Sequence, residues 1–329
     1  MDCPRSANKF MMWFLIYSII ISLAAAPIVL IVSLSCASVG WDESDIMNAV
    51  LIGQDFLLFL IPMAVYLLFS GQSIKKVIPF KKLSLKNAIY VILITLLVMP
   101  MMSVLATVTN IVVQSDTSEM FTEIMEKMPG WVSVISMAIM PPIFEESMFR
   151  GFILTGYKKY GFVKAALISA LFFGMMHLDL YQLPYATMVG VIFAGFVYCT
   201  GSIYASMLAH FVINGSQTAM FLLFKHFGDT SMLEEQATVT MEQQLLSVYV
   251  WLGIMIFCLP FLIFLVNRFV KRNKANYEAY IAEDKVENSV EELDAVDGME
   301  QKENKGRWLD KCFVITMIIY LVYMALFGR

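Results

Sequence analysis

Apolar stretches alternate with short polar segments along the whole chain. A helix needs about 20 apolar residues to cross a membrane, and nine stretches come close to that length: residues 10–34, 49–69, 87–113, 131–156, 162–178, 184–200, 202–224, 246–267 and 309–327. The pattern predicts an all-α fold, a polytopic membrane helix bundle with about nine spans. The fifth to seventh stretches are short and closely joined, which is typical of helices inside a bundle or of partly re-entrant segments.

The polar segments suggest a division of the chain. We expect N-terminal transmembrane helices over residues 1–130, a catalytic core over 131–224, a loop and the eighth helix over 225–274, an acidic cytoplasmic linker over 275–308 and a C-terminal transmembrane helix over 309–329. Ten Asp or Glu against three Lys between Ala275 and Gly306 favour a solvated spacer over a partner-binding segment. The first apolar run continues to about Val39, beyond the length of a signal-peptide core, so an uncleaved first span is expected.

Composition excludes a soluble globular class. The chain has 329 residues, of which 59% are hydrophobic and 15% charged, whereas soluble domains contain about 45–50% and 25%. One soluble core cannot bury that excess, so the lipid bilayer is an expected partner and a nucleic acid is not. The five cysteines show no CxxC or other metal spacing and are expected to be free thiols.

Basic residues gather in alternate loops. They lie in the N-terminal arm and after the second, fourth and eighth apolar stretches: Arg5, Lys9, Lys75, Lys76, Lys81, Lys82, Lys86, Lys158, Lys159, Lys164, Arg268, Lys271, Arg272 and Lys274. By the positive-inside rule, this distribution predicts a multi-pass protein of the cell membrane with a cytoplasmic N-terminus and an external C-terminus.

Few ionisable or amide residues fall within the spans, where such residues are functional candidates by default. They are Asp55 in the second span, Glu145, Glu146 and Arg150 in the fourth, His177 in the fifth, and His210 and Asn214 in the seventh. Glu146 and Arg150 are four residues apart, so they share a helix face and can pair. Glu145 points about 100° away around the helix and stays unpaired. Asp55 is interpreted as an interfacial residue near the outer end of its span.

Helix rise places several of these residues at similar depth. Counted from the expected cytoplasmic ends at about 1.5 Å per residue, Glu145 and Asn214 lie about 18 Å deep, His177 about 22 Å and His210 about 12 Å. We therefore expect one buried polar cavity that opens to the cytoplasm. Pro141 and Pro142 precede Glu145 by one turn, which predicts a bend or a helix start that aims Glu145 at His177.

Glutamate and histidine in a dry cavity suit the activation of water, because a desolvated carboxylate is a stronger base. His210 and Asn214 can donate to the oxyanion of a tetrahedral intermediate. The chain has neither G-x-S-x-G nor H-E-x-x-H. The residues thus favour amide hydrolysis by direct attack of water.

Three motifs in order resemble one protein family. "EESMFR" (Glu145–Arg150), "FGMMH" (Phe173–His177) and "HFVIN" (His210–Asn214) are similar to the EExxxR, FxxxH and HxxxN motifs of the Rce-type CAAX prenyl endopeptidases and their bacterial relatives, the CPBP or ABI family of intramembrane glutamic proteases. The resemblance implies that Glu145 and His177 activate water, that His210 and Asn214 stabilise the oxyanion, and that Glu146 and Arg150 give structural support.

The same resemblance implies a peptide or protein substrate, with or without a lipid anchor. Eukaryotic members cut the last three residues from prenylated proteins, while bacterial relatives are linked to bacteriocin processing, self-immunity, secretion or surface display. We expect no cofactor and no metal. Alternatives are a zinc protease that uses the same carboxylates and histidines, a non-enzymatic immunity or scaffold protein, and a transporter. The sequence shows no inverted repeats, which argues against a transporter.

Overall fold

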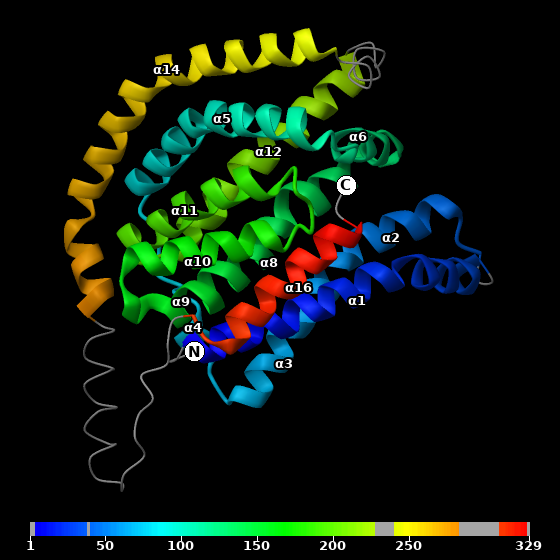
Figure 1. The fold of residues 1–329 in the computed structure, drawn as a ribbon, viewed down its shortest axis with the longest axis horizontal. Helices are drawn as coiled ribbons and strands as arrows, with labels where there is room; N and C mark the ends of the chain where they lie inside the picture. The colour runs from blue at the N-terminus through cyan, green and yellow to red at the C-terminus, as the bar shows by residue number, and fades with distance from the viewer. Residues whose placement is uncertain (1–3, 38–39, 228–239, 283–308, 328–329) are drawn as a thin grey trace, which may run out of the picture.

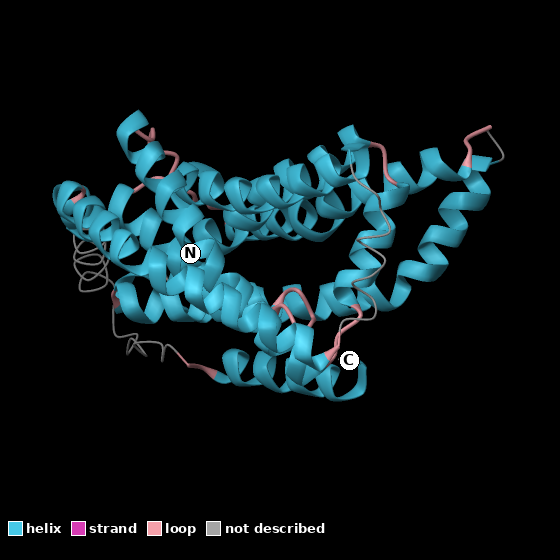
Figure 2. Cartoon of the chain, turned by 90° about the horizontal axis from the view of Figure 1, so that it is seen from above, coloured by secondary structure: helices cyan, strands magenta, loops and turns pink. Residues whose placement is uncertain are grey.

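The computed structural model describes residues 4–37, 40–227, 240–282 and 309–327. Within these ranges the chain forms a bundle of helices (Figures 1 and 2), and one isolated bridge between Phe80 and Ser202 is the only β-pairing. The all-α fold expected from the apolar pattern is confirmed.

Seven helical stretches of the described chain are long and apolar enough to cross a membrane: Ser6–Ser35, Ser44–Ser70, Leu85–Val113, Gly130–Tyr160, Leu183–Thr200, Ile203–Phe227 and Met241–Arg272. Two shorter apolar helices are α10 (Phe162–Met175) and α16 (Lys311–Phe327). Together they follow the nine predicted stretches in order. The span count of nine and the orientation of the termini stay predictions.

Several helices extend past the apolar stretches that signalled them. These helices are α1 (Pro4–Ala37), α5 (Leu85–Val113) and α14 (Met241–Arg272). At the start of α14, Thr240 accepts a hydrogen bond from the Gln243 backbone, and the Gln243 side chain accepts one from Thr240. Such a capping box starts a helix upstream of its apolar part.

One helix lies in a segment expected to be a loop. The amphipathic helix α6 (Thr117–Lys127) ends close to the C-terminal part of α12 (Ile203–Phe227). Lys225 of α12 donates to the carbonyl oxygens of Met125, Glu126 and Met128, at distances of 3.3, 2.6 and 2.9 Å. These bonds satisfy carbonyls that a helix end leaves without partners.

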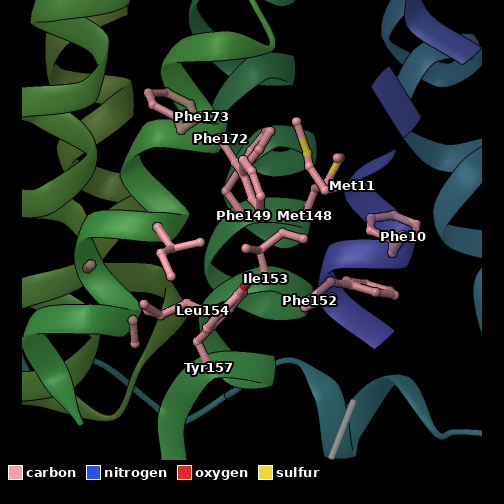
Figure 3. Packing of buried hydrophobic residues seen from close by; sticks show 14 of the residues in the cluster. Phe10, Met11, Met148, Phe149, Phe152, Ile153, Leu154, Tyr157, Phe172 and Phe173 are labelled. Carbon is pink, nitrogen blue, oxygen red and sulfur yellow. The ribbon is translucent and has the colours of Figure 1, made fainter. Parts of the chain in front are cut away.

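The fourth span is the centre of the bundle. It runs through α7 (Gly130–Ser133), the π-helical η2 (Val134–Ile139), α8 (Met140–Glu146), the π-helical η3 (Ser147–Ile153), α9 (Leu154–Tyr157) and the 3₁₀ turn η4 (Lys158–Tyr160). Figure 3 shows Phe149 and Phe152 of η3 between Phe10 of α1 and Phe172 of α10. A helix buried on both sides needs apolar residues all round, which explains the run "SMFRGFILTGY" with one arginine.

The helices α10 and α11 (Leu183–Thr200) pack closely through small residues. A Cβ at Gly190 would lie 2.8 Å from the backbone of Ala170, and one at Gly174 would lie 2.9 Å from the Leu183 carbonyl. Glycine therefore lets the two backbones approach, as in membrane helix pairs generally.

The C-terminal helix α16 lies along α1 (Figure 1). Asn8 of α1 donates to Asp310 at 2.9 Å and accepts from the Tyr157 hydroxyl, so one amide joins three segments. The second candidate span is one continuous helical stretch made of α2 (Glu43–Asp55), η1 (Phe56–Leu60) and α3 (Ile61–Ser70), and the short α4 (Ile74–Val77) follows it.

The predicted linker lies mostly outside the described residues, which end at 282 and resume at 309. Its first part, residues 275–282, is helical. Tyr280 is buried there, and the Lys158 ammonium lies 3.8 Å from its ring centroid. The interpretation as a solvated spacer is wrong for this part, because the side chains of Tyr277, Tyr280 and Ile281 pack on the bundle.

Candidate active site

The backbone around the two glutamates changes its helix type twice. Glu145 and Glu146 are the last two residues of α8, between the π-helical η2 and η3. The chain stays helical through Pro141 and Pro142, so no helix starts there, although the helix type changes from π to α at Met140. That the prolines aim Glu145 at His177 stays a prediction. Short π-helical segments are frequent at functional sites, because they turn side chains away from the regular helix face.

Glu146 and Arg150 form the predicted buried pair. Arg150 Nη1 lies 2.9 Å from Glu146 Oε1, and both side chains are fully buried. Arg150 Nη2 donates to the Gly190 carbonyl at 3.1 Å, and the guanidinium lies 4.3 Å from the Phe173 ring centroid. One carbonyl, one ring and one carboxylate thus surround the charge, which makes its burial tolerable.

His210 contacts both glutamates. Its Nδ1 lies 3.1 Å from Glu146 Oε1, and its Nε2 lies 3.9 Å from Glu145 Oε2. Because the Arg150-paired carboxylate can only accept, Nδ1 of His210 carries a hydrogen and donates it. The pair of Arg150 and Glu146 therefore orients His210, and His210 presents Nε2 to Glu145.

His177 lies two residues past the end of α10, although it was expected inside a helix over residues 162–178. Leu178 has a φ of 51°, a conformation that turns the chain sharply after the histidine. His177 Nδ1 donates to the Phe173 carbonyl at 3.0 Å, which leaves Nε2 as the proton acceptor of a neutral ring. The rings of His177 and His210 both contact the Phe173 ring edge to face, at 5.4 and 5.9 Å.

Asn214 binds a backbone carbonyl that the proline pair leaves without a partner. Asn214 Nδ2 donates to the Met137 carbonyl at 3.1 Å. That carbonyl would accept from residue 141 in an α-helix and from residue 142 in a π-helix, but both are prolines and carry no N–H. Asn214 thus fixes the start of α8 to α12 from one turn beyond His210.

Replacing Asn214 with leucine is expected to destabilise the protein by about 1–3 kcal/mol, because the Met137 carbonyl then stays buried and unsatisfied. Denaturant unfolding in detergent measures the change. Gln217→Leu, at an exposed position of the same helix, serves as the matched control and should change stability little. An Asn214→Leu protein that is as stable as the wild type would contradict this role of the amide.

Asp55 also belongs to the surroundings of the glutamates. Sequence reasoning placed it at the membrane interface, but the structure buries it inside the bundle with 6% of its surface exposed. The residue after it, Phe56, contacts Phe144, the residue before Glu145, with ring centroids 5.1 Å apart. The sequence did carry a signal for this burial. Asp55 is the only acidic residue of α2 after Asp45, so a charge stands alone at the end of an apolar stretch.

The described ranges contain no group of three or more His, Cys, Asp or Glu arranged to hold a metal ion. The zinc alternative stays a prediction for experiment. The described cysteines, Cys199, Cys258 and Cys312, are free thiols as expected. His226 is exposed in the last turn of α12, away from the glutamates.

Comparison with known proteins covers this same region. The family model for Type II CAAX prenyl endopeptidase Rce1-like matches residues 127–216, which include all six predicted site residues. The "Putative membrane peptidase YdiL" of Bacillus subtilis (strain 168) is 32% identical over 102 residues, which are 31% of this chain and 41% of that protein. The chain thus matches less than half the length of this relative. No solved structure matches the chain. The match to the family model agrees with the resemblance seen in the three motifs, since residues 127–216 are similar to Rce1-like type II CAAX prenyl endopeptidases.

Proposed function

We propose that this protein is a membrane-embedded endopeptidase of the glutamic type, in which Glu145 activates the water that attacks a peptide bond. One observation carries the proposal. Glu145 lies unpaired beside His210, whereas its neighbour Glu146 is held by both Arg150 and His210. Two adjacent glutamates thus have different environments, a common arrangement where one carboxyl supports the site and the other reacts.

The proposed reaction needs no covalent intermediate. Glu145 takes a proton from water while the water oxygen bonds to the carbonyl carbon of the substrate. The same carboxyl then returns the proton to the leaving nitrogen as the C–N bond breaks. His177, with Nε2 as acceptor, assists in holding the water, as the FxxxH resemblance implies. The products are one carboxylic acid and one amine.

His210 is proposed to stabilise the oxyanion through Nε2. Because Nδ1 already donates to Glu146, Nε2 can donate only when the ring carries both protons. Asn214 has two amide hydrogens, and one of them is used on the Met137 carbonyl. The other is available to the oxyanion, so the structural bond and the proposed catalytic role are compatible.

The substrate is proposed to be a peptide or protein, with or without a lipid anchor, that reaches the site from the cytoplasm or the bilayer. Bacteriocin-type processing or immunity and CAAX-like C-terminal cleavage are the two substrate classes that the family resemblance suggests. Comparing membrane and secreted peptides of wild-type cells with those of a Glu145→Gln strain tests the proposal. A fragment that disappears in the variant gives the substrate and its cleavage site.

A non-enzymatic immunity or scaffold role is the second candidate, and a transporter the third. In either case the cavity would bind a peptide or solute without cutting it. Strains with Glu145→Ala and His177→Ala separate these candidates from the endopeptidase. If both strains keep full biological function at normal protein abundance, catalysis is not the function of the site.

Chelation is expected to leave the activity unchanged, because the proposed reaction uses no metal. The measurement is the hydrolysis rate of the purified protein before and after dialysis against EDTA. Loss of activity that zinc restores would overturn the metal-free mechanism and favour the zinc alternative.

A further inference from the structure

The helix α11 reaches the site although none of the three motifs lies on it. It follows α10 in the chain, precedes α12 and packs against both. Its Phe193 is buried, with 1% of its surface exposed, and the ring contacts both His210 and Arg150. An aromatic residue outside the motifs therefore touches two of the residues at the centre of the site.

The rings of Phe193 and Phe173 both lie against the Arg150 guanidinium. Its central carbon Cζ is 5.2 Å from the Phe193 centroid and 4.3 Å from the Phe173 centroid. The two ring centroids are 6.4 Å apart, at an interplanar angle of 57°. A desolvated cation is attracted to such ring faces. The two rings therefore help to fix the place from which Arg150 pairs with Glu146.

The same two rings contact His210 from different directions. The His210 ring lies at 33° to the Phe193 ring, with centroids 5.5 Å apart, and at 90° to the Phe173 ring, with centroids 5.9 Å apart. Glu146 Oε1 holds the Nδ1 edge at 3.1 Å. The χ2 torsion of histidine has broad minima, so one hydrogen bond leaves the plane of the ring loosely defined. The Phe193 ring beside it restricts that rotation and with it the direction of Nε2.

Gly190 lets the backbone of α11 come close enough for these contacts. It precedes Phe193 by three residues, so both lie on the same face of the helix. Its carbonyl accepts from Arg150 Nη2 at 3.1 Å. A Cβ at this position would lie 2.8 Å from the Ala170 backbone and 3.2 Å from Arg150 Nη2. One face of α11 thus holds Arg150 through a carbonyl and a ring, and the same ring supports His210.

We propose that Phe193 is a positioning residue of the site, whose ring holds the His210 imidazole in the plane that aims Nε2 at Glu145. In this arrangement Nε2 lies 3.9 Å from Glu145 Oε2. The catalytic meaning of the proposal rests on the proposed endopeptidase function, in which His210 stabilises the oxyanion. Loss of positioning should lower kcat more than it changes KM, because the oxyanion forms only on the way to the transition state.

Nuclear magnetic resonance of the purified full-length protein in detergent tests the positioning without any substrate. The chain contains three histidines, so isotope labelling of histidine nitrogens gives few signals, and a His210→Gln variant identifies those of His210. The Nδ1–H that binds Glu146 should give a sharp proton signal in the wild type. In Phe193→Leu this signal should broaden beyond detection, because the ring then samples several orientations and its hydrogen bond opens.

Phe196→Leu is the matched control, because Phe196 is a buried phenylalanine of the same helix whose ring contacts Phe269 of α14. Both substitutions remove a buried ring and should lower the thermal midpoint to a similar extent. On a peptide identified from the fragment comparison, Phe193→Leu should lower kcat about ten- to a hundredfold and leave KM within about twofold. Phe196→Leu should keep kcat, KM and the His210 signal of the wild type.

A His210 signal that stays sharp in Phe193→Leu overturns the proposal, and so does an equal loss of kcat in Phe193→Leu and Phe196→Leu. If Phe193→Leu does not fold, Phe193→Met, a flexible side chain without a ring, takes its place. If neither variant folds, a cross-peak between the Phe193 and His210 rings in the wild type supports the proposal, and its absence overturns it.

The spectra also separate this inference from the proposed function. Loss of the His210 signal in Phe193→Leu, in a protein whose wild type cuts no peptide, overturns the endopeptidase function and supports the positioning of His210. An active wild-type enzyme with a sharp His210 signal in Phe193→Leu overturns this inference alone.

Discussion

Glu145→Gln is expected to lower the rate of peptide hydrolysis by about a hundred- to ten-thousand-fold, the usual contribution of a general base. Glutamine has nearly the shape of glutamate but cannot take a proton from water. The side chain lies at the end of α8 and contacts His210 at 3.9 Å, so its loss leaves the Glu146–Arg150 pair intact. The hydrolysis rate of a peptide identified from the fragment comparison measures the effect.

The fold of Glu145→Gln should stay intact, because the substitution removes a desolvated carboxyl group and leaves the packing unchanged. Thermal unfolding in detergent should give a midpoint at or above that of the wild type, as is common when a reactive group is removed from its site. Glu123→Gln, an exposed position on α6, is the control and should keep the full rate. A Glu145→Gln protein that hydrolyses peptide at the wild-type rate would exclude Glu145 as the base.

Arg150→Met is expected to destabilise the protein by about 3–5 kcal/mol, the cost of leaving one partner of a buried ion pair alone. Glu146 would keep only His210 as a donor in a fully buried position. The stability of Arg150→Lys should lie between that of the wild type and that of Arg150→Met. Lysine keeps the charge, but it lacks the forked guanidinium that reaches both Glu146 and the Gly190 carbonyl. Denaturant unfolding in detergent gives the free energies.

The double variant Glu146→Gln, Arg150→Met distinguishes the pair from simple packing. Removing both charges should cost less than Arg150→Met alone, since no carboxylate is then left without its partner. Lys271→Met, at an exposed position of α14, should change stability little. If the double variant loses at least as much stability as the sum of the two single substitutions, burial of the charge is not the reason for the pair.

Local patterns predicted those parts of the site that depend on one helix. The four-residue spacing of Glu146 and Arg150 was enough for their pairing, because residues at this spacing share a face in any helix. The same rule separated Glu145 from the pair. The prolines lie where the helix type changes from π to α, since the missing N–H groups alter the backbone bonds whatever surrounds them.

Contacts between helices could not be predicted in the same way. The bond from Asn214 to the Met137 carbonyl joins residues 77 positions apart, and the ring contact of Phe56 with Phe144 joins the second and fourth spans. The part of the predicted linker that packs through Tyr280 was expected in solvent, because the acidic residues that follow it dominate the composition of the whole segment. Each of these outcomes depends on which helix faces which.

The sequence by itself determined the all-α membrane architecture, the order of the apolar helices and the motifs that make residues 127–216 similar to the Rce1-like family model, because hydrophobic length and short motifs are local properties of the chain. Only the tertiary structure decided that His210 joins both glutamates, that Asn214 satisfies the carbonyl freed by the prolines, and that Asp55 is buried inside the bundle. The physical reason is that apolar helix faces can pack against one another in several rotations, and only the assembled bundle fixes which polar side chains meet.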